Sequence, residues 1–356
     1  MSTKLIQEMK EAKTPMVLSI TGGGATILKN FFSISGISQL VLEAIVPYHP
    51  KSLSKFLGST QTYACNSRTA RAMAMESFKR AKGIAGSSSV IGLGCTAALR
   101  TTRERRGKDR CHVCVQSRTT SRTLDMQLDQ SLTRAQQENQ CRQLIFVAIA
   151  NTLSLETDYE GLNFRETSVE APSLWKDLLE GNTNKTNDKK YAAVFPGSFA
   201  PFHEGHEKII LLAEKKLNVR PALEISVKNV DKPPLDFVSM EERNIPTQEI
   251  VFTNAATFEE KADLFPSTTF IVGIDTLVRI DEAGYYNGKR NKSKILEKFK
   301  TQNIRFLVFG RLVNGQFLTL SSITISAALL ELCDEIPESD FRVDISSTEI
   351  RASEKD

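Results

Sequence analysis

Short apolar runs alternate with segments of helical spacing along most of this 356-residue chain. In the N-terminal half, the expected strands are the runs 16–20, 40–46, 90–93 and 111–116. In the C-terminal half, they are the runs 191–195, 222–227, 250–253, 269–273 and 305–309. Each run has the length of a buried strand, and most are followed by a stretch that repeats apolar residues every three to four positions. This alternation predicts α/β architecture, with a doubly wound parallel sheet in the C-terminal half.

Length and composition predict two domains joined by a polar connector. A chain of this length is longer than the roughly 100–200 residues that a single domain usually contains. Residues 154–190 are rich in acidic and amide side chains, and only the stretch around Trp175 has the spacing of a short helix. We therefore expect domains at 1–153 and 191–356 with a linker at 154–190. Residues 124–153 are expected to form one or two helices.

Composition and charge narrow the classes of protein that fit. The longest apolar run, 144–150, is far shorter than the roughly 20 residues of a membrane span, and residues 1–14 have no apolar core of a secretion signal. The six cysteines are scattered, which fits free thiols in a reducing cytosol, so we expect a cytoplasmic protein. The net charge of +4 is mild, and the basic stretch 100–110 has no interleaved aromatic residues. Neither nucleic acid nor a membrane is an expected partner, and a homo-oligomer is left open.

Polar residues that suit phosphate follow three of the expected strands in the C-terminal half. His203 and His206 lie where the strand 191–195 gives way to a helix, and a polar turn, 273–276, follows another strand. The third segment, 346–351, has capping-box spacing and ends on Arg351. Helix N-termini and arginine side chains both favour phosphate oxygens. Because the carboxyl ends of parallel strands meet at one edge of a sheet, the pattern predicts a nucleoside triphosphate site.

These segments resemble the signatures of a known superfamily. The stretch 197–206, Gly-Ser-Phe-Ala-Pro-Phe-His-Glu-Gly-His, resembles the HxGH motif of the nucleotidylyltransferases, and 345–351 resembles their ISSTxIR motif. The turn 272–276 is similar to the ribose-contacting turn of nicotinamide or nicotinate mononucleotide adenylyltransferases. The resemblance covers residues 191–351, and Ala200 replaces an Asp or Asn that is often found in the first motif. It implies transfer of AMP from ATP to a pyridine mononucleotide, with release of pyrophosphate.

The resemblance also assigns roles to individual residues. It implies that His203 and His206 hold the α- and β-phosphates, with Arg351 as the third catalytic residue. Further nucleotide-binding residues that it implies are Gly197, Ser198, Phe199, Lys232, Gly273, Asp275, Ser346, Ser347 and Thr348. Mg²⁺ is expected to arrive with ATP, and no dedicated metal site of the protein is expected. Two alternatives stay open: a nucleotide-binding regulatory or scaffold protein without transfer, and a transferase that uses another phosphorylated acceptor, such as pantetheine phosphate, or CTP.

The N-terminal half resembles a second family. The succession from Leu18 to Gly23, followed by Tyr48 and the glycine-rich stretch 92–96, is similar to the C-terminal domain of the CinA family of nicotinamide mononucleotide deamidases. The resemblance covers residues 5–153 and implies Ser19 as an amidase nucleophile. Leu53 stands where that family has an assisting lysine. A serine hydroxyl without an adjacent base is a poor nucleophile, so we expect a domain that keeps the fold without hydrolysis, and that binds a nucleotide or forms a dimer.

Overall fold

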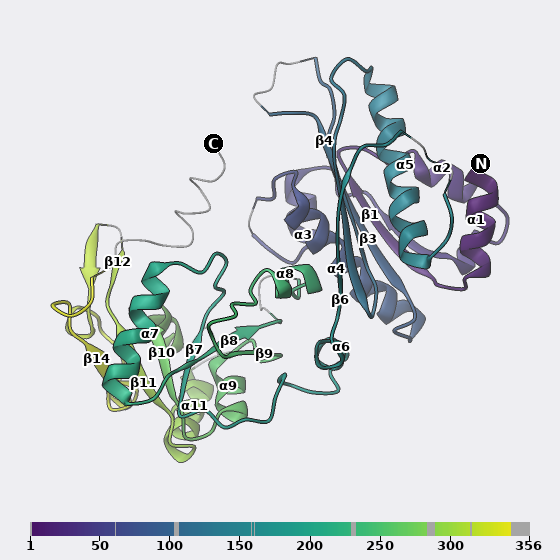
Figure 1. Cartoon of the computed structure of the whole chain (residues 1–356). Helices are drawn as coiled ribbons and strands as arrows, with labels where there is room; N and C mark the ends of the chain where they lie inside the picture. The colour runs from purple at the N-terminus through teal and green to yellow at the C-terminus, as the bar shows by residue number, and fades with distance from the viewer. Residues whose placement is uncertain are drawn as a thin grey trace. The chain divides into compact units, whose positions relative to one another are not determined.

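The computed structural model describes residues 2–60, 62–102, 107–157, 159, 161–228, 233–282, 289–313 and 315–342 (Figure 1). The chain divides into two compact units of α/β structure. The first holds residues 1–180 and 231–241, and the second holds residues 181–230 and 242–356. Over the described ranges, no helix combines the length and the apolar character that crossing a membrane requires. The α/β class and the parallel sheet predicted from the sequence are confirmed.

A mixed six-stranded sheet forms the centre of the first unit. Its strands, in spatial order, are β2 (Val41–Ile45), β1 (Met16–Thr21), β3 (Ile91–Ala98), β4 (Arg110–Gln116), β5 (Thr120–Gln127) and β6 (Arg165–Glu170). The first three strands run parallel, and the pairs from β3 to β6 are antiparallel. Strands β3, β4 and β5 follow one another directly in the chain, whereas helix α5 (Arg134–Leu153) lies between β5 and β6.

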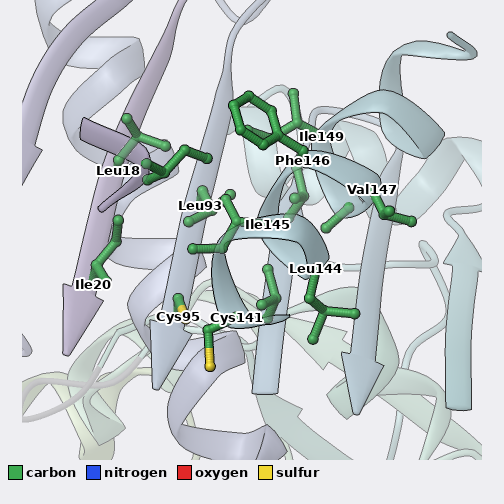
Figure 2. Packing of buried hydrophobic residues seen from close by; sticks show 14 of the residues in the cluster. Leu18, Ile20, Leu93, Cys95, Cys141, Leu144, Ile145, Phe146, Val147 and Ile149 are labelled. Carbon is green, nitrogen blue, oxygen red and sulfur yellow. The ribbon is translucent and has the colours of Figure 1, made fainter. Parts of the chain in front are cut away.

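Helices cover both faces of this sheet. Helix α4 (Ser67–Ala85) lies directly on β3, because a Cβ at Gly92 or Gly94 would approach the α4 backbone to 2.0 Å and 2.2 Å. The opposite face packs on α1 (Ser2–Glu11), α2 (Ile27–Phe32) and α5 (Arg134–Leu153). There, side chains of β1 and β3 such as Leu18 and Leu93 meet Ile145 and its neighbours on α5 (Figure 2). The short helix α3 (Pro50–Phe56) follows β2.

Two stretches of the first unit differ from the sequence prediction. The expected linker, 154–190, contains β6 as an edge strand of the sheet and α6 (Ser173–Glu180) as a helix of the same unit. Strand β6 alternates exposed and half-buried positions and has few apolar residues, so its composition is that of a loop. The prediction of helix throughout 124–153 was wrong at its start, because residues up to Gln127 complete β5. In both places the strand is specified by pairing with β5 or β4 and not by local apolar content.

A short segment from later in the chain completes the first unit. Residues 233–241, which include α8 (Phe237–Glu241), lie between two strands of the second unit in sequence but pack on β5 and β6. The backbone N–H of Phe237 donates to Ser121 Oγ at 2.9 Å, and the Phe237 ring stacks on Trp175 with centroids 6.4 Å apart. Asp236 forms an ion pair with Arg71 of α4 at 3.4 Å, with both side chains only 6% exposed. A buried ion pair, an aromatic stack and a backbone hydrogen bond therefore hold this segment on the first unit.

The second unit is built on a six-stranded sheet whose strands are all parallel. Its spatial order is β14 (Cys333–Ile336), β11 (Arg305–Phe309), β10 (Thr269–Gly273), β7 (Ala193–Pro196), β8 (Ala222–Ser226) and β9 (Ile250–Thr253). The helices are α7 (Glu204–Leu217), α9 (Phe258–Leu264), α10 (Ile274–Asp281), α11 (Lys289–Thr301) and α12 (Ala327–Leu330), and β12 (Arg311–Val313) pairs with β13 (Gln316–Leu318). When only the strands of this sheet are numbered, in chain order, the spatial order is 3-2-1-4-5-6, so the direction of winding reverses between β7 and β10. Ligands of such sheets bind outside the carboxyl ends of the strands at this reversal.

The buried charge pair that anchors residues 233–241 gives a prediction for stability. Replacing Asp236 by Ala leaves Arg71 charged and buried without its carboxylate, which we expect to lower the free energy of unfolding of the first unit by about 3–5 kcal/mol. Trp175 is the sole tryptophan of the chain and stacks on Phe237, so its fluorescence during urea unfolding reports on this unit. The control is Glu43→Ala, which breaks the exposed Arg80–Glu43 pair and is expected to cost about 0–1 kcal/mol. Equal shifts of the two midpoints would contradict the prediction.

Candidate functional site

The turn after β7 brings two histidines together at the start of α7. The helix begins at Glu204, with His203 as its N-cap residue in extended conformation. The rings of His203 and His206 stack with centroids 3.7 Å apart, and the backbone N–H of His203 donates to His206 Nδ1 at 3.2 Å. The first N–H groups of α7 point out of the same end of the helix. Two imidazoles and a helix N-terminus therefore share one position at the reversal of the sheet.

Aromatic rings enclose His206 and hold it in place. Phe199 meets the imidazole edge-on at 5.0 Å between centroids, and Phe202 stacks on it at 5.4 Å. Phe199 is itself fully buried against Phe195. A Cβ at Gly197 would lie 2.6 Å from the Phe199 ring, so the chain needs glycine there for the ring to fold back under the turn. Gly197 and Phe199 thus shape the turn, whereas the exposed Ser198 accepts from Arg243 Nε through its carbonyl oxygen at 2.9 Å.

This enclosure changes the acid–base behaviour of both histidines. Burial, followed by the nearby charges of His203 and Arg311, lowers the pKa of His206 from its ordinary value of 6.5 to about 3. Burial also lowers the pKa of His203, with a further lowering by Arg311 and an opposing effect of Glu204. Both imidazoles are therefore neutral near pH 7 in the absence of a ligand. A neutral imidazole still offers an N–H donor to a phosphate oxygen.

The end of β10 supplies a carboxylate to the same edge of the sheet. Gly273 is the N-cap residue of α10, and Asp275 lies in the first turn of that helix. Asp275 Oδ2 forms an ion pair with Arg311 Nη1 at 2.9 Å. Arg311 follows the last residue of β11 after one glycine, and its charge acts on both histidines. The structure thus brings His203, His206 and Asp275 to one edge, as the sequence predicted, and adds an arginine to them.

Sequence reasoning missed Arg311 and Arg243. A usable signal existed for Arg311: a basic residue one glycine after the predicted strand 305–309 occupies the same kind of strand end as the three segments that were considered. For Arg243 there was no such signal. It lies two residues after helix α8, which ends at Glu241, and follows no strand. Its hydrogen bond to the Ser198 carbonyl joins residues that are 45 positions apart in the chain.

Five of the predicted site residues lie outside the described residues: Lys232, Ser346, Ser347, Thr348 and Arg351. The described chain leads toward the second motif as far as Arg342. There, Phe341 packs edge-on against Phe309, the last residue of β11, with centroids 5.0 Å apart. The last described residues before the second motif therefore lie at the carboxyl edge of the sheet, the edge that carries the histidines.

In the first unit, Ser19 occupies a place that does not suit a nucleophile. Its side chain is fully buried in β1 and faces α4, where Oγ donates to Leu93 O at 3.0 Å and accepts from Ser77 Oγ at 2.9 Å. No histidine, lysine or carboxylate contacts Ser19 within the described part of this unit. A nucleophile needs an adjacent base and access to its substrate, and Ser19 has neither. The role of Ser19 that the resemblance implied is not supported by this geometry.

A cavity of about 670 Å³ does lie close by, at the ends of β1 and β2. Its polar lining includes Thr21, Tyr48, Arg134 and Glu138, together with the backbone of the turn at Gly22. Ile20 lines it, and Ser19 points to the other face of the sheet, because successive residues of a strand face opposite sides. Glu138 accepts from the backbone N–H groups of Gly24 and Thr26 at 2.7 Å and 3.0 Å, which fixes the turn. The cavity has the size of a small-molecule site, and Ser19 is not part of its lining.

The sequence of the second unit matches a known family. The family model described as Cytidylyltransferase-like matches residues 194–353, a range that begins in β7 and includes the two sequence motifs at 197–206 and 345–351. Residues 194–353 form a cytidylyltransferase-like domain of the nucleotidyltransferase superfamily. No curated protein matches the sequence of the chain.

Solved structures that resemble this chain match its N-terminal part. One is a competence-damaged (CinA) superfamily protein from Klebsiella pneumoniae, with 12% identity and a TM-score of 0.36, covering 43% of this chain and 98% of that protein. Another is a competence/damage inducible protein from Agrobacterium tumefaciens, with 16% identity and a TM-score of 0.36, covering 43% of this chain and 92% of that one. The cytidylyltransferase-like domain lies outside the N-terminal part that these structures match.

The lowered pKa of His206 in the cytidylyltransferase-like domain predicts its titration. In NMR spectra of the ligand-free protein, the His206 imidazole should stay neutral from pH 8 down to pH 5, because burial holds its pKa at about 3. The unfolded chain binds this proton below about pH 6.5, so the contribution of His206 to stability is lost as the pH falls from 6.5 toward 3. A bound polyphosphate should raise the pKa, because an anion favours the imidazolium. The His206 signal is assigned as the one that is absent from the spectrum of His206→Ala. A His206 pKa near 6.5 in the ligand-free protein would contradict the prediction that burial lowers it.

The buried position of Ser19 predicts the behaviour of the first unit toward nicotinamide mononucleotide. We expect no release of ammonia from this compound by the full chain, since no activated hydroxyl reaches the cavity. Ser19→Ala should lower the free energy of unfolding by about 1–2 kcal/mol through the loss of two buried hydrogen bonds. Ammonia release that the wild type shows and Ser19→Ala lacks would restore Ser19 as a nucleophile.

Proposed function

We propose that the second unit transfers AMP from ATP to nicotinamide or nicotinate mononucleotide and releases pyrophosphate. The observation that carries this proposal is the stacked pair His203 and His206 at the N-terminus of α7, where the winding of the parallel sheet reverses. Support for the adenylyl donor and the pyridine acceptor comes from the motif at 272–276, which ends β10 and begins α10 at the next strand of the same edge.

The chemistry is an in-line displacement at the α-phosphorus. An oxygen of the acceptor's phosphate forms the new P–O bond, and the bond to the bridging oxygen of pyrophosphate breaks. No covalent intermediate with the protein is required, so the contribution of the protein is to position both substrates and to stabilise charge on the phosphoryl oxygens.

The residues of the site divide this work. His203 and His206 donate to oxygens of the α- and β-phosphates, and the backbone N–H groups of α7 lie at the same end of the helix. Aromatic packing by Phe199 fixes His206 before the nucleotide arrives, which lowers the entropic cost of binding. Gly273 and Asp275 border the ribose, and Ser198 lies at the rim of the turn. Residues of the second motif, Ser347, Thr348 and Arg351, complete the proposed polyphosphate site.

Magnesium is expected to accompany ATP. In the part of the chain that the structure describes, no three His, Cys, Asp or Glu side chains are placed to hold a metal ion together. The donors that suit Mg²⁺ are then the phosphate oxygens and water, with at most one or two carboxylates. When bound, the ion neutralises charge that develops on the leaving pyrophosphate.

The proposal is tested by incubating the full chain with Mg²⁺ and ATP or CTP, and with nicotinamide mononucleotide, nicotinate mononucleotide or pantetheine phosphate as acceptor. We expect pyrophosphate and a dinucleotide from ATP with one of the pyridine mononucleotides. His206→Ala should lower kcat by about 10²–10³, because it removes one donor to the transition state. The matched control is His49→Ala, since His49 only caps α3 of the first unit.

The other results decide between the alternatives. Product from pantetheine phosphate or from CTP alone would make the protein a different transferase of the superfamily. Tight ATP binding without pyrophosphate release from any acceptor would make it a nucleotide-binding regulatory or scaffold protein. A wild-type rate in His206→Ala would remove the imidazole pair from the mechanism.

A further inference from the structure

Arg311 and Asp275 meet at the carboxyl edge of the second sheet. Strands β10 and β11 are parallel neighbours with Gly273 opposite Phe309, so the residues that follow them emerge side by side. Arg311 Nη1 and Asp275 Oδ2 lie 2.9 Å apart. The two side chains remain 44% and 43% exposed, so a ligand in the crevice reaches both.

The same guanidinium group is close enough to both histidines to act on them. Its positive charge lowers the pKa of His203 and of His206. The histidines follow β7, Asp275 follows β10 and Arg311 follows β11, and these three strands are neighbours in the sheet. Arg311 therefore interacts with groups that follow the other two strands. It carries a permanent charge among groups that are neutral or negative near pH 7.

The pairing creates a conflict for the proposed nucleotide site. Asp275 is assigned to the ribose, yet its carboxylate is occupied by Arg311 in the ligand-free protein. Arg311 has the planar fork that suits phosphate oxygens, yet it is directed to a carboxylate. If the guanidinium group of Arg311 exchanged the Asp275 carboxylate for a phosphate, both side chains would become available to the nucleotide.

We propose that Arg311 binds the polyphosphate of the nucleotide, and that its ion pair with Asp275 opens on binding and frees Asp275 for the ribose. This inference rests on the nucleotide site of the proposed function and adds a phosphate-binding residue and a coupling between two parts of the ligand. An exposed ion pair is weak, so a polyanion displaces the carboxylate at little cost. Coupling is reciprocal: whatever breaks the pair favours both the phosphate and the ribose subsites.

The two halves of the ligand test the exchange separately. Inorganic tripolyphosphate and adenosine serve as probes, and their affinities for the full chain are measured by calorimetry. Asp275→Asn should bind tripolyphosphate about twofold to fivefold more tightly, because Arg311 no longer has a competing carboxylate. The same variant should bind adenosine more weakly, since an acceptor of the ribose hydroxyl loses its charge.

Arg311→Gln should have the opposite pattern. We expect tripolyphosphate to bind about tenfold to a hundredfold more weakly, through the loss of a charged hydrogen bond. Adenosine should bind as well as to the wild type or better, because Asp275 is free from the start. A role of Arg311 in stability alone would weaken both probes together.

A matched pair at the other edge of the sheet provides the control. Arg305 and Asp334 belong to β11 and β14, lie 2.8 Å apart and are 42% and 54% exposed, but Arg305 begins β11 where Arg311 follows its end. Arg305→Gln and Asp334→Asn should leave both affinities unchanged.

Three results would overturn the proposal: no tripolyphosphate binding to the wild type, unchanged or weaker tripolyphosphate binding to Asp275→Asn, or no effect of Arg311→Gln on that probe. These measurements need no turnover. If the affinities follow the pattern but no acceptor gives product, the exchange stands and the transferase proposal falls. If product forms and neither substitution changes the affinity for tripolyphosphate, the transferase proposal stands and the exchange falls.

Discussion

The burial of Phe199 under the turn after β7 is the contact on which the candidate site depends. Its backbone has a positive φ of 43°, a conformation that residues other than glycine seldom adopt. The ring packs on Phe195 and His206, so apolar burial offsets the strain of the backbone. Without the Phe199 ring, the turn would lose its apolar packing, and the imidazole of His206 would lose the aromatic contact that orients it. Gly197 is required for the same reason, since any side chain there would collide with the ring.

The sequence allows prediction of those parts of the molecule that local pattern specifies. The buried strands of the second unit are short apolar runs, and the histidines are placed by the strand-to-helix turn in which they occur, so both were predictable. Strand β6 and residues 233–241 were not, because each acquires its place through partners far away in the chain: Thr120 to Asp125 for the strand, and Ser121 and Arg71 for the segment. Contacts of that range leave no periodicity in the local sequence. Arg311 was predictable only in part. The sequence indicated that it follows a strand, but its position beside Asp275 and the histidines depends on which strands are neighbours in the sheet.

Ser19 illustrates how strand geometry limits inference from a motif. A resemblance over Leu18 to Gly23 aligns residues one by one, but function depends on which face of the strand each side chain takes. In this chain Ile20 lines the cavity, whereas Ser19 is fixed by Leu93 O and Ser77 against α4. Close packing of α4 on Gly92 and Gly94 leaves no room for a substrate on that face. The first unit therefore retains a cavity whose polar groups, Tyr48, Arg134 and Glu138, suit binding more than hydrolysis.

Among the described residues of the candidate site, the charges of the second unit are nearly balanced in the absence of a ligand. His203 and His206 are uncharged near pH 7, and Arg311 is matched by Asp275. If the histidines were protonated beside Arg311, three like charges would repel one another, which is why its charge lowers both pKa values. In the exchange proposed above, the negative charge of a polyphosphate would offset this repulsion, which would raise the pKa of both imidazoles and compete with Asp275 for the guanidinium. Anion binding and protonation of the histidines would then be linked equilibria: an anion that raises the pKa of the imidazoles binds more tightly as the pH falls.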